Sequence, residues 1–174
     1  MCGAVINYTI APCSLGLLLV AATERGICAV KLGDSDGGLA ADLAKEYPSA
    51  EIHRSESMLS EPLDKLLNYL SGNHPDLQLP LDIQATAFQW QVWENLRAIP
   101  YGETRSYGEV AKAMGRPTAV RAVARACATN PVALIIPCHR VIREDQSLGG
   151  YRWGLERKDT LLDHEKRRKG GETL

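Results

Sequence analysis

Hydrophobic and polar positions group along the first third of the chain in a way that predicts strands. Apolar-rich stretches at 4–10, 15–23 and 26–32 are separated by short polar turns at Pro12-Cys13-Ser14 and Glu24-Arg25-Gly26. Connections this short join antiparallel neighbours, because parallel strands need a crossover of a dozen or more residues. We therefore expect the chain to begin with a small antiparallel sheet.

A helical period replaces this pattern after the third stretch. Leu39, Leu43 and Tyr47 recur every four residues, which predicts a helix over 37–47 that ends before Pro48. Its single apolar face indicates that it covers one side of the sheet.

A second leucine stripe predicts another helix at 61–70, with Ser60 as its N-cap. A polar connection follows at 71–76, and 77–83 is expected to be extended, although a proline within it favours an edge or irregular position. These residues contain no catalytic constellation, so we interpret 1–84 as a scaffold domain.

Two capping boxes open the second half of the chain. Thr86-Ala87-Phe88-Gln89 and Ser106-Tyr107-Gly108-Glu109 each place a hydroxyl and a long polar side chain at a helix start. The apolar positions that follow predict helices that end near 98 and 114.

A third helix in this half is predicted directly after a short turn. Gly115-Arg116-Pro117 forms the turn, and Thr118 is expected to cap a helix that runs to about 128. Two short helices joined by a glycine-containing turn are typical of a helix-turn-helix, which places its second helix on DNA.

The faces of the third helix differ in character. One face is apolar, with Val120, Val123 and Cys127. A second face carries the alanines Ala119, Ala122 and Ala126, and a third side carries the cations Arg121 and Arg125. Alanines beside arginines allow close approach to a phosphate backbone. A small-residue packing seam with two solvated arginines explains the helix equally well, so the pattern alone leaves both readings open.

The stretch Ile136-Pro137-Cys138-His139-Arg140-Val141-Ile142 has the strongest chemical character in the chain. A proline fixes the backbone immediately before the thiol of Cys138. A thiol attacks as its thiolate, and His139 could take the proton directly or through one water if a third group orients the ring. A structural cysteine beside a core histidine is the alternative.

The last predicted helix spans 154–169 and offers a candidate for that third group. Leu155, Lys158, Leu162 and Glu165 lie close to one stripe, in which the carboxylate is the unexpected member. Glu165 is either the partner of a nearby Lys or Arg, or the group that orients His139.

Composition narrows the possible settings of this chemistry. No apolar run approaches the roughly 20 residues of a membrane span, so we expect a cytoplasmic protein. Five cysteines cannot all pair in disulfides, and neither cysteines nor histidines show metal-ligand spacing, so we expect neither metal nor cofactor. The net charge of −1 combines −6 for 1–84 (5 Lys/Arg, 11 Asp/Glu) with +5 for 85–174 (15 against 10), which favours a polyanionic partner for the second half.

Together these residues make the chain similar to the O6-alkylguanine-DNA alkyltransferases, most of all to the alkyltransferase half of the bacterial adaptive-response protein. The shared features in family order are Ser106-Tyr107, Arg121, Asn130, the stretch around Cys138, Gly149-Gly150-Tyr151, and the pair His164-Glu165. The resemblance implies an α+β fold: a ribonuclease H-like sheet domain at 1–84, and a mostly helical, winged-helix-like domain at 85–174.

The implied function is DNA repair by a methylated-DNA–protein-cysteine methyltransferase. A damaged base, mainly O6-methylguanine with O4-methylthymine as a second substrate, rotates out of the duplex, and its alkyl group passes irreversibly to Cys138 in one turnover. The resemblance assigns catalytic roles to Cys138, His139, Glu165, Tyr107 and Asn130, with Tyr101 as a second candidate proton donor.

The resemblance also assigns binding roles. The DNA contacts are Arg121, which fills the gap left by the base, with Tyr107, Ala119, Ala122, Arg125 and Arg140. The substrate pocket consists of Tyr151, Arg152, Trp153 and Val141, and the bulk of Trp153 predicts poor acceptance of benzyl groups. We expect a monomer that acts near the nucleoid of a prokaryote.

Two other functions use parts of the same pattern. A non-catalytic sensor of alkylated bases would share the fold but lack the cysteine. A Cys-His hydrolase would share the thiol, but it would leave the helix-turn-helix and the charge asymmetry unexplained.

Overall fold

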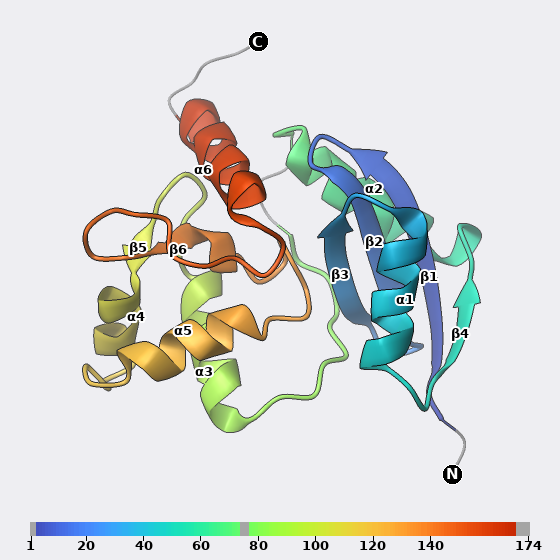
Figure 1. The fold of residues 1–174 in the computed structure, drawn as a ribbon, viewed down its shortest axis with the longest axis horizontal. Coiled ribbons are helices and arrows are strands. Elements are labelled where there is room, and N and C mark those ends of the chain that lie inside the picture. The colour runs from blue at the N-terminus through green and yellow to red at the C-terminus, as the bar shows by residue number, and fades with distance from the viewer. Residues whose placement is uncertain (1–2, 74–76, 170–174) are drawn as a thin grey trace. The chain divides into compact units, whose positions relative to one another are not determined.

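A computed structural model describes residues 3–73 and 77–169 of the 174-residue chain (Figure 1). The chain divides into two compact units, one of 1–83 with 131–133 and one of 84–130 with 134–174. The domain boundary expected between 84 and 85 stays a prediction. The α+β fold class is confirmed, with a small sheet in the first unit and mostly helices in the second.

The first unit is built on a four-stranded sheet. Its strands are β1 (Val5–Cys13), β2 (Gly16–Ala22), β3 (Ile27–Gly33) and β4 (Glu51–Arg54), in the order β3-β2-β1-β4. The two expected hairpins are antiparallel, as predicted.

Two features of this sheet differ from expectation. The first turn is shorter than predicted, because Pro12 and Cys13 still pair with β2. The strand β4 was not predicted at all, and it pairs parallel with β1. Its sequence shows no apolar alternation because it is an edge strand with only Ile52 half-buried, so backbone pairing rather than side-chain burial holds it.

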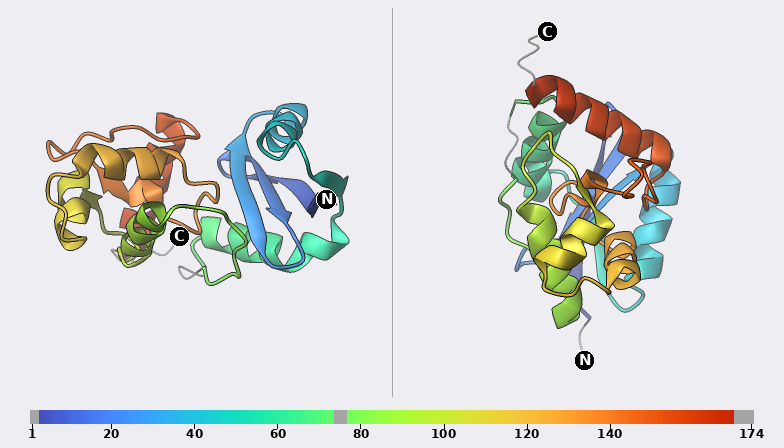
Figure 2. Two further views of the ribbon diagram at one scale, coloured as in Figure 1. Left: turned by 90° about the horizontal axis from the view of Figure 1, so that it is seen from below. Right: turned by 90° about the vertical axis from the view of Figure 1, so that its left-hand side faces the viewer.

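Two helices cover the opposite faces of the sheet (Figure 2). The helix α1 (Asp36–Glu46) starts at Ser35, whose hydroxyl accepts from the Gly38 N–H, and it buries Leu39 and Leu43 in the core. The helix α2 (Ser60–Leu70) follows a 3-10 turn, η1 (Ser57–Leu59). Ser60 is therefore the first helical residue rather than the predicted N-cap.

The segment after α2 pairs with β3 within residues 77–83. Residues 74–76 of the predicted polar connection lie outside the described residues. In the stretch 77–83, Leu81 bridges to Ile27 of β3, and the Asp82 N–H donates to the Ile27 carbonyl. The stretch is thus extended at one point but forms no strand of its own.

Both predicted capping boxes open helices in the second unit. The helix α3 (Ala87–Arg97) begins at Thr86 and α4 (Tyr107–Ala113) begins at Ser106, each with both reciprocal hydrogen bonds. A short parallel pair, β5 (Arg105–Ser106) with β6 (Val141–Ile142), lies beside α4.

The helix-turn-helix is present with a longer connection than predicted. The second helix, α5 (Val120–Ala128), has Ala119 as its N-cap and no side-chain cap, so the cap predicted at Thr118 is wrong. The Ala119 N–H donates to the Arg116 carbonyl, which places Thr118 inside a turn rather than at a helix start.

The last helix, α6 (Leu155–Lys169), packs by a stripe that matches the predicted one at Lys158 and Glu165 but has Leu161 in place of Leu155 and Leu162. Lys158, Leu161 and Glu165 are buried, whereas Leu155 is 50% exposed. Positions spaced by three and four residues lie on one helical face, and the helix packs with two charged groups on that face. Among the described residues, no helix is long and apolar enough to cross a bilayer.

Candidate active site

Cys138 sits on a fixed turn between α5 and β6. It begins a 3-10 turn, η2 (Cys138–Arg140), and is 4% exposed. Four residues earlier, Leu134 has a φ of 71°, a left-handed conformation that costs a bulky residue roughly 1–2 kcal/mol. The Asn130 amide donates to the Ile136 carbonyl (2.8 Å) and to the Cys138 Sγ (3.3 Å), which fits the turn-holding role predicted for it.

A cavity of about 270 Å³ opens in front of this thiol. Its lining consists of Tyr107, Ala124, Cys127, Ala128, Cys138, Gly150, Tyr151 and Arg152, all from the second unit. The volume is just below the range typical of sites for drug-sized ligands, so it suits a smaller ligand.

The environment of Cys138 keeps the thiol protonated at rest. Burial raises the pKa of Cys138 above its ordinary value, against the lowering effects of the Asn130 hydrogen bond and of the positive charges on Lys158 and Arg152. A nucleophilic reaction at this sulfur therefore needs a base that accepts the proton as the attack occurs.

The side chains of His139, Arg140 and Glu165 form a buried network beside the thiol. The His139 Nε2 lies 2.7 Å from the Glu165 Oε1, and Arg140 donates through Nε to Oε2 (2.9 Å) and through Nη2 to Oε1 (3.0 Å). The exposed fractions of these side chains are 0% for His139, 7% for Arg140 and 2% for Glu165. Glu165 is thus both the partner of an arginine, Arg140, and the group that contacts the His139 ring, which are the two roles that the sequence left open.

Charge decides how the histidine is protonated. Burial alone would raise the pKa of Glu165, but its contacts with His139 and Arg140 outweigh burial and hold that pKa well below its usual range. Burial lowers the pKa of His139, so its ring is neutral near pH 7. An ionised carboxylate only accepts, so Nε2 carries the ring proton and Nδ1 is left as an acceptor. Nδ1 is buried and has no hydrogen-bond partner among the described residues.

Two tyrosines were predicted as alternative proton donors. Tyr107 lines the cavity, and burial raises its pKa to about 12, so its hydroxyl keeps its proton near neutral pH. Tyr101 is not among the lining residues; its ring lies 5.6 Å from the Arg140 guanidinium carbon. The geometry therefore favours Tyr107 as the donor.

The predicted DNA-binding residues separate into exposed and buried groups. Arg121 and Arg125 are exposed on α5, and Ala119 and Ala122 are half-buried. Arg140 is buried, and its remaining donor, Nη1, bonds to the Ile99 carbonyl (2.7 Å). Its prediction as a DNA contact is therefore wrong: the carboxylate of Glu165 holds the guanidinium inside the fold.

The predicted pocket residues also separate. Tyr151 and Arg152 line the cavity, but Val141 and Trp153 do not. Val141 is fully buried in β6, and the Trp153 ring packs edge-to-face on Tyr151 with centroids 5.4 Å apart. Trp153 supports a wall of the cavity rather than filling it, so the basis of the prediction about benzyl groups is wrong.

Sequence reasoning missed two residues at this site. Cys127 was assigned to an apolar face of α5 but lines the cavity with Cys138. Lys158 is fully buried, and its ammonium donates to three main-chain carbonyls. Its place in the stripe of the last helix was the available signal, because an inward-facing lysine requires partners.

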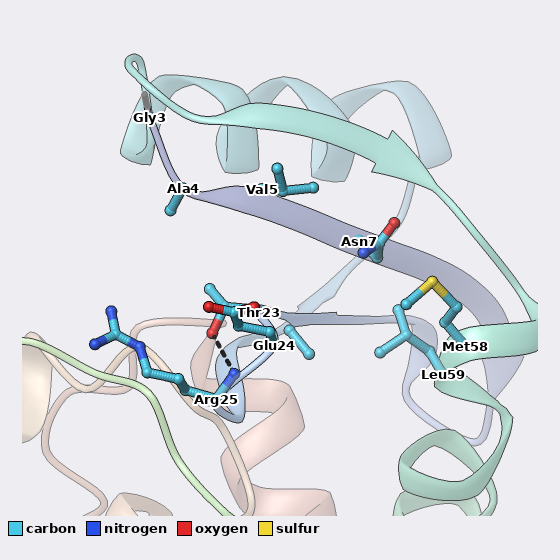
Figure 3. Close-up of a pocket in the computed structure, with 10 residues that line it drawn as sticks. Gly3, Ala4, Val5, Asn7, Thr23, Glu24, Arg25, Met58 and Leu59 are labelled. Atoms are coloured by element: carbon cyan, nitrogen blue, oxygen red, sulfur yellow. Dashed lines mark hydrogen bonds between the residues drawn. The ribbon is translucent and has the colours of Figure 1, made fainter. Parts of the chain in front are cut away.

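A second, larger cavity lies in the first unit and lacks such chemistry. Its volume is about 620 Å³, and its lining joins the start of β1, the end of β2 and η1 (Figure 3). Thr23 accepts from the Arg25 N–H there (3.2 Å), and Met58 is 68% exposed. The residues around it include no cysteine or histidine. The described residues of the chain also contain no group of three metal-ligating side chains.

The fold and the site together define a protein that combines a helix-turn-helix with a buried cysteine at a cavity. The family model described as the 6-O-methylguanine DNA methyltransferase DNA binding domain matches residues 87–167. The ribonuclease-like domain model of the same family matches 6–83. The chain belongs to the 6-O-methylguanine DNA methyltransferase family, which confirms the resemblance found in the sequence.

Curated relatives agree with this assignment. The bifunctional transcriptional activator/DNA repair enzyme Ada of Escherichia coli is 51% identical over 160 residues, which cover 92% of this chain and 45% of that protein. The chain thus spans about half the length of Ada. The methylated-DNA–protein-cysteine methyltransferase of Mycobacterium tuberculosis is 49% identical over 128 residues, or 72% of this chain and 78% of that one.

Solved structures show the same similarity. The crystal structure of the Mycobacterium tuberculosis O6-methylguanine methyltransferase has a TM-score of 0.79 at 34% identity, covering 94% of each chain. The structure of that protein in complex with DNA has a TM-score of 0.75 over the same shares.

Proposed function

We propose that this protein repairs DNA by transferring an alkyl group from the O6 atom of a guanine in duplex DNA to Cys138. The observation that carries the proposal is a buried thiol next to a neutral histidine in a cavity that suits one nucleobase. The relatives named above are called DNA repair enzymes or cysteine methyltransferases, which supports the same reaction.

The thiol proton moves to His139 in this mechanism. As the Cys138 Sγ attacks the alkyl carbon, Nδ1 of His139 takes the thiol proton directly or through one water, because Nε2 already donates to Glu165. The carboxylate stabilises the imidazolium that results, as does an orienting acid in other nucleophile–histidine systems.

The leaving base needs a proton in return. One sulfur–carbon bond forms as one oxygen–carbon bond breaks, and the electrons of the broken bond stay on guanine. The Tyr107 hydroxyl lines the cavity and carries a proton near neutral pH, so in this proposal it donates to the departing base and then regains a proton from water.

The reaction stops after one turnover. A thioether is stable in water, and Cys127, the second thiol at the cavity, is held protonated because burial strongly raises its pKa. A protonated thiol does not remove an alkyl group from sulfur. Cys127 therefore does not regenerate the Cys138 thiol, and the expected stoichiometry stays one repaired base per protein.

DNA reaches this cavity after base rotation, in our proposal. A base inside a duplex cannot enter, so the nucleotide must leave the stack at a cost of a few kcal/mol. In this proposal Arg121 fills the gap, and its exposure on α5 supports that role. The thiol, the network and the helix-turn-helix all belong to one unit of one chain, which supports a monomer as the acting form.

Incubation with duplex DNA that carries O6-methylguanine tests the function. Mass spectrometry should find one methyl group on Cys138 and none elsewhere. Cys138→Ala should bind the damaged duplex but accept no methyl group, whereas Cys13→Ala, which removes a half-buried thiol of the first unit, should react normally. Several repaired bases per protein molecule, or methylation of Cys138→Ala, would contradict the proposal.

A further inference from the structure

Lys158 is a buried cation that the proposed mechanism does not use. It lies on α6 with no exposed surface, and its Nζ donates to the carbonyls of Val141 (2.6 Å), Leu148 (2.5 Å) and Gly150 (3.1 Å). An ammonium has three N–H donors and no acceptor, so three carbonyls satisfy it completely.

The three carbonyls belong to β6 and to the segment that leads from it to α6 (Figure 1). Within this segment, Gly149 has a φ of 71°, and a Cβ there would lie 3.0 Å from the Tyr107 hydroxyl. The following residues Gly150, Tyr151 and Arg152 line the cavity. The ammonium therefore ties one wall of the cavity to the helix α6.

We propose that Lys158 is a positioning residue, which fixes residues 148–152 so that this wall holds the alkylated base against Cys138. The inference deepens the proposed function and rests on it. It assigns to Lys158 no contact with the base and no transfer of a proton.

The charge of Lys158 adds a pH response to this role. Burial is the main cause that lowers the pKa of Lys158 to about 8, and the charge of the nearby Arg143 acts in the same direction. The thiols Cys138 and Cys127 also face the ammonium, and they would raise its pKa only as thiolates. The Tyr107 ring, with its centroid 6.0 Å from Nζ, is the other titratable group that faces it. Above about pH 8 the neutral amine keeps two donors, so one of the three carbonyls loses its partner.

Single-turnover transfer from the free base O6-methylguanine tests the inference, because no duplex has to open. At pH 7, Lys158→Met should raise the half-saturating concentration of base about tenfold or more, the effect of lost hydrogen bonds to a charged group. The maximal rate constant should change less. Lys166→Met, which removes an exposed lysine of the same helix, should match the unmodified protein.

The pH profile separates positioning from a general loss of structure. We compare the half-saturating concentration of Lys158→Met with that of the unmodified protein as a ratio. This ratio should fall from pH 7 to pH 9.5, because deprotonation of Lys158 weakens binding of the base only in the unmodified protein. A variant with normal half-saturation at pH 7, or a ratio that is the same at both pH values, would overturn the inference.

Hydrogen exchange gives a second measurement that needs neither the variant nor the reaction. In the unmodified protein, the backbone amides of 143–154 should become less protected from hydrogen exchange between pH 7 and pH 9.5, relative to the amides of α3 and after correction for the intrinsic exchange rate at each pH. Unchanged relative protection would overturn the inference even if Lys158→Met does not fold. If no alkyl group reaches Cys138 in the unmodified protein, the proposed function fails while this measurement still decides the role of Lys158.

Discussion

Apolar side chains form nearly all of the interior described for the first unit, whereas the second unit buries several polar and charged groups. Thr9 and Lys31 are the buried polar residues described in the first unit. Those of the second unit are Ser106, Asn130, His139, Arg140, Lys158 and Glu165. The surfaces differ too, since the sequence halves carry net charges of −6 and +5.

The two kinds of interior contribute differently to the free energy of unfolding. Burying apolar surface stabilises the first unit by about 25 cal/mol per Å². A buried ion pair is at best near neutral for stability, because desolvation of each charge costs several kcal/mol. The buried ion pairs of the second unit therefore add little net stability, and their effect is to fix the histidine tautomer beside Cys138.

The largest expected effect concerns the buried network. Glu165→Gln leaves the Arg140 guanidinium without a countercharge, so the free energy of unfolding in urea should fall by about 3–5 kcal/mol. Methyl transfer should slow as well, because His139 loses its charged partner. Glu156→Gln, at an exposed position on the same helix, should change neither quantity. If Glu165→Gln were as stable as the unmodified protein, the buried charges of the second unit would not depend on one another as described.

The same carboxylate predicts an effect of acid. Because the folded-state pKa of Glu165 is lowered, its contribution to stability is complete above its unfolded pKa of about 4.3 and is lost as pH falls from there toward the folded value. The stability difference between the unmodified protein and Glu165→Gln should therefore narrow below about pH 4.

A core substitution in the first unit should change stability alone. Leu43 is fully buried between α1 and the sheet, so Leu43→Ala should lower the free energy of unfolding by about 2–5 kcal/mol. At a temperature where the variant is folded, its rate of methyl transfer should equal that of the unmodified protein. Met58→Ala, at an exposed position, should cost less than about 0.5 kcal/mol. A slowed transfer step in Leu43→Ala would show that the first unit shapes the chemistry.

The smallest expected effect belongs to the surface of the second unit. Arg121→Ala should slow repair of duplex DNA about tenfold, because losing this side chain raises the free-energy barrier by roughly 1.4 kcal/mol, part of the few kcal/mol that base rotation requires. Transfer from the free base should be unchanged, because the free base does not have to rotate out of a duplex. Arg97→Ala, which removes an exposed cation from α3, is the charge-matched control. Equal losses on both substrates would mean that Arg121 supports the pocket or the fold.

Local sequence was sufficient wherever a few adjacent residues decide the structure. The capping boxes at Thr86 and Ser106 were correct because each is complete within four residues. The turn that presents Cys138 and the adjacency of His139 are likewise properties of one short stretch. The family resemblance rests on such stretches, which is why the sequence also led to the fold class and to the proposed reaction.

Tertiary structure alone decided which distant groups meet. Glu165 is 26 residues from His139, and only the packing of α6 by its charged face brings it to both His139 and Arg140. The same packing turns Lys158 toward three carbonyls, while Trp153 is turned behind Tyr151 instead of into the cavity. Periodicity gives the spacing of side chains along a helix, but the partners of a buried charge depend on the position of that helix in the fold, because a charge is stable there only where complementary groups converge.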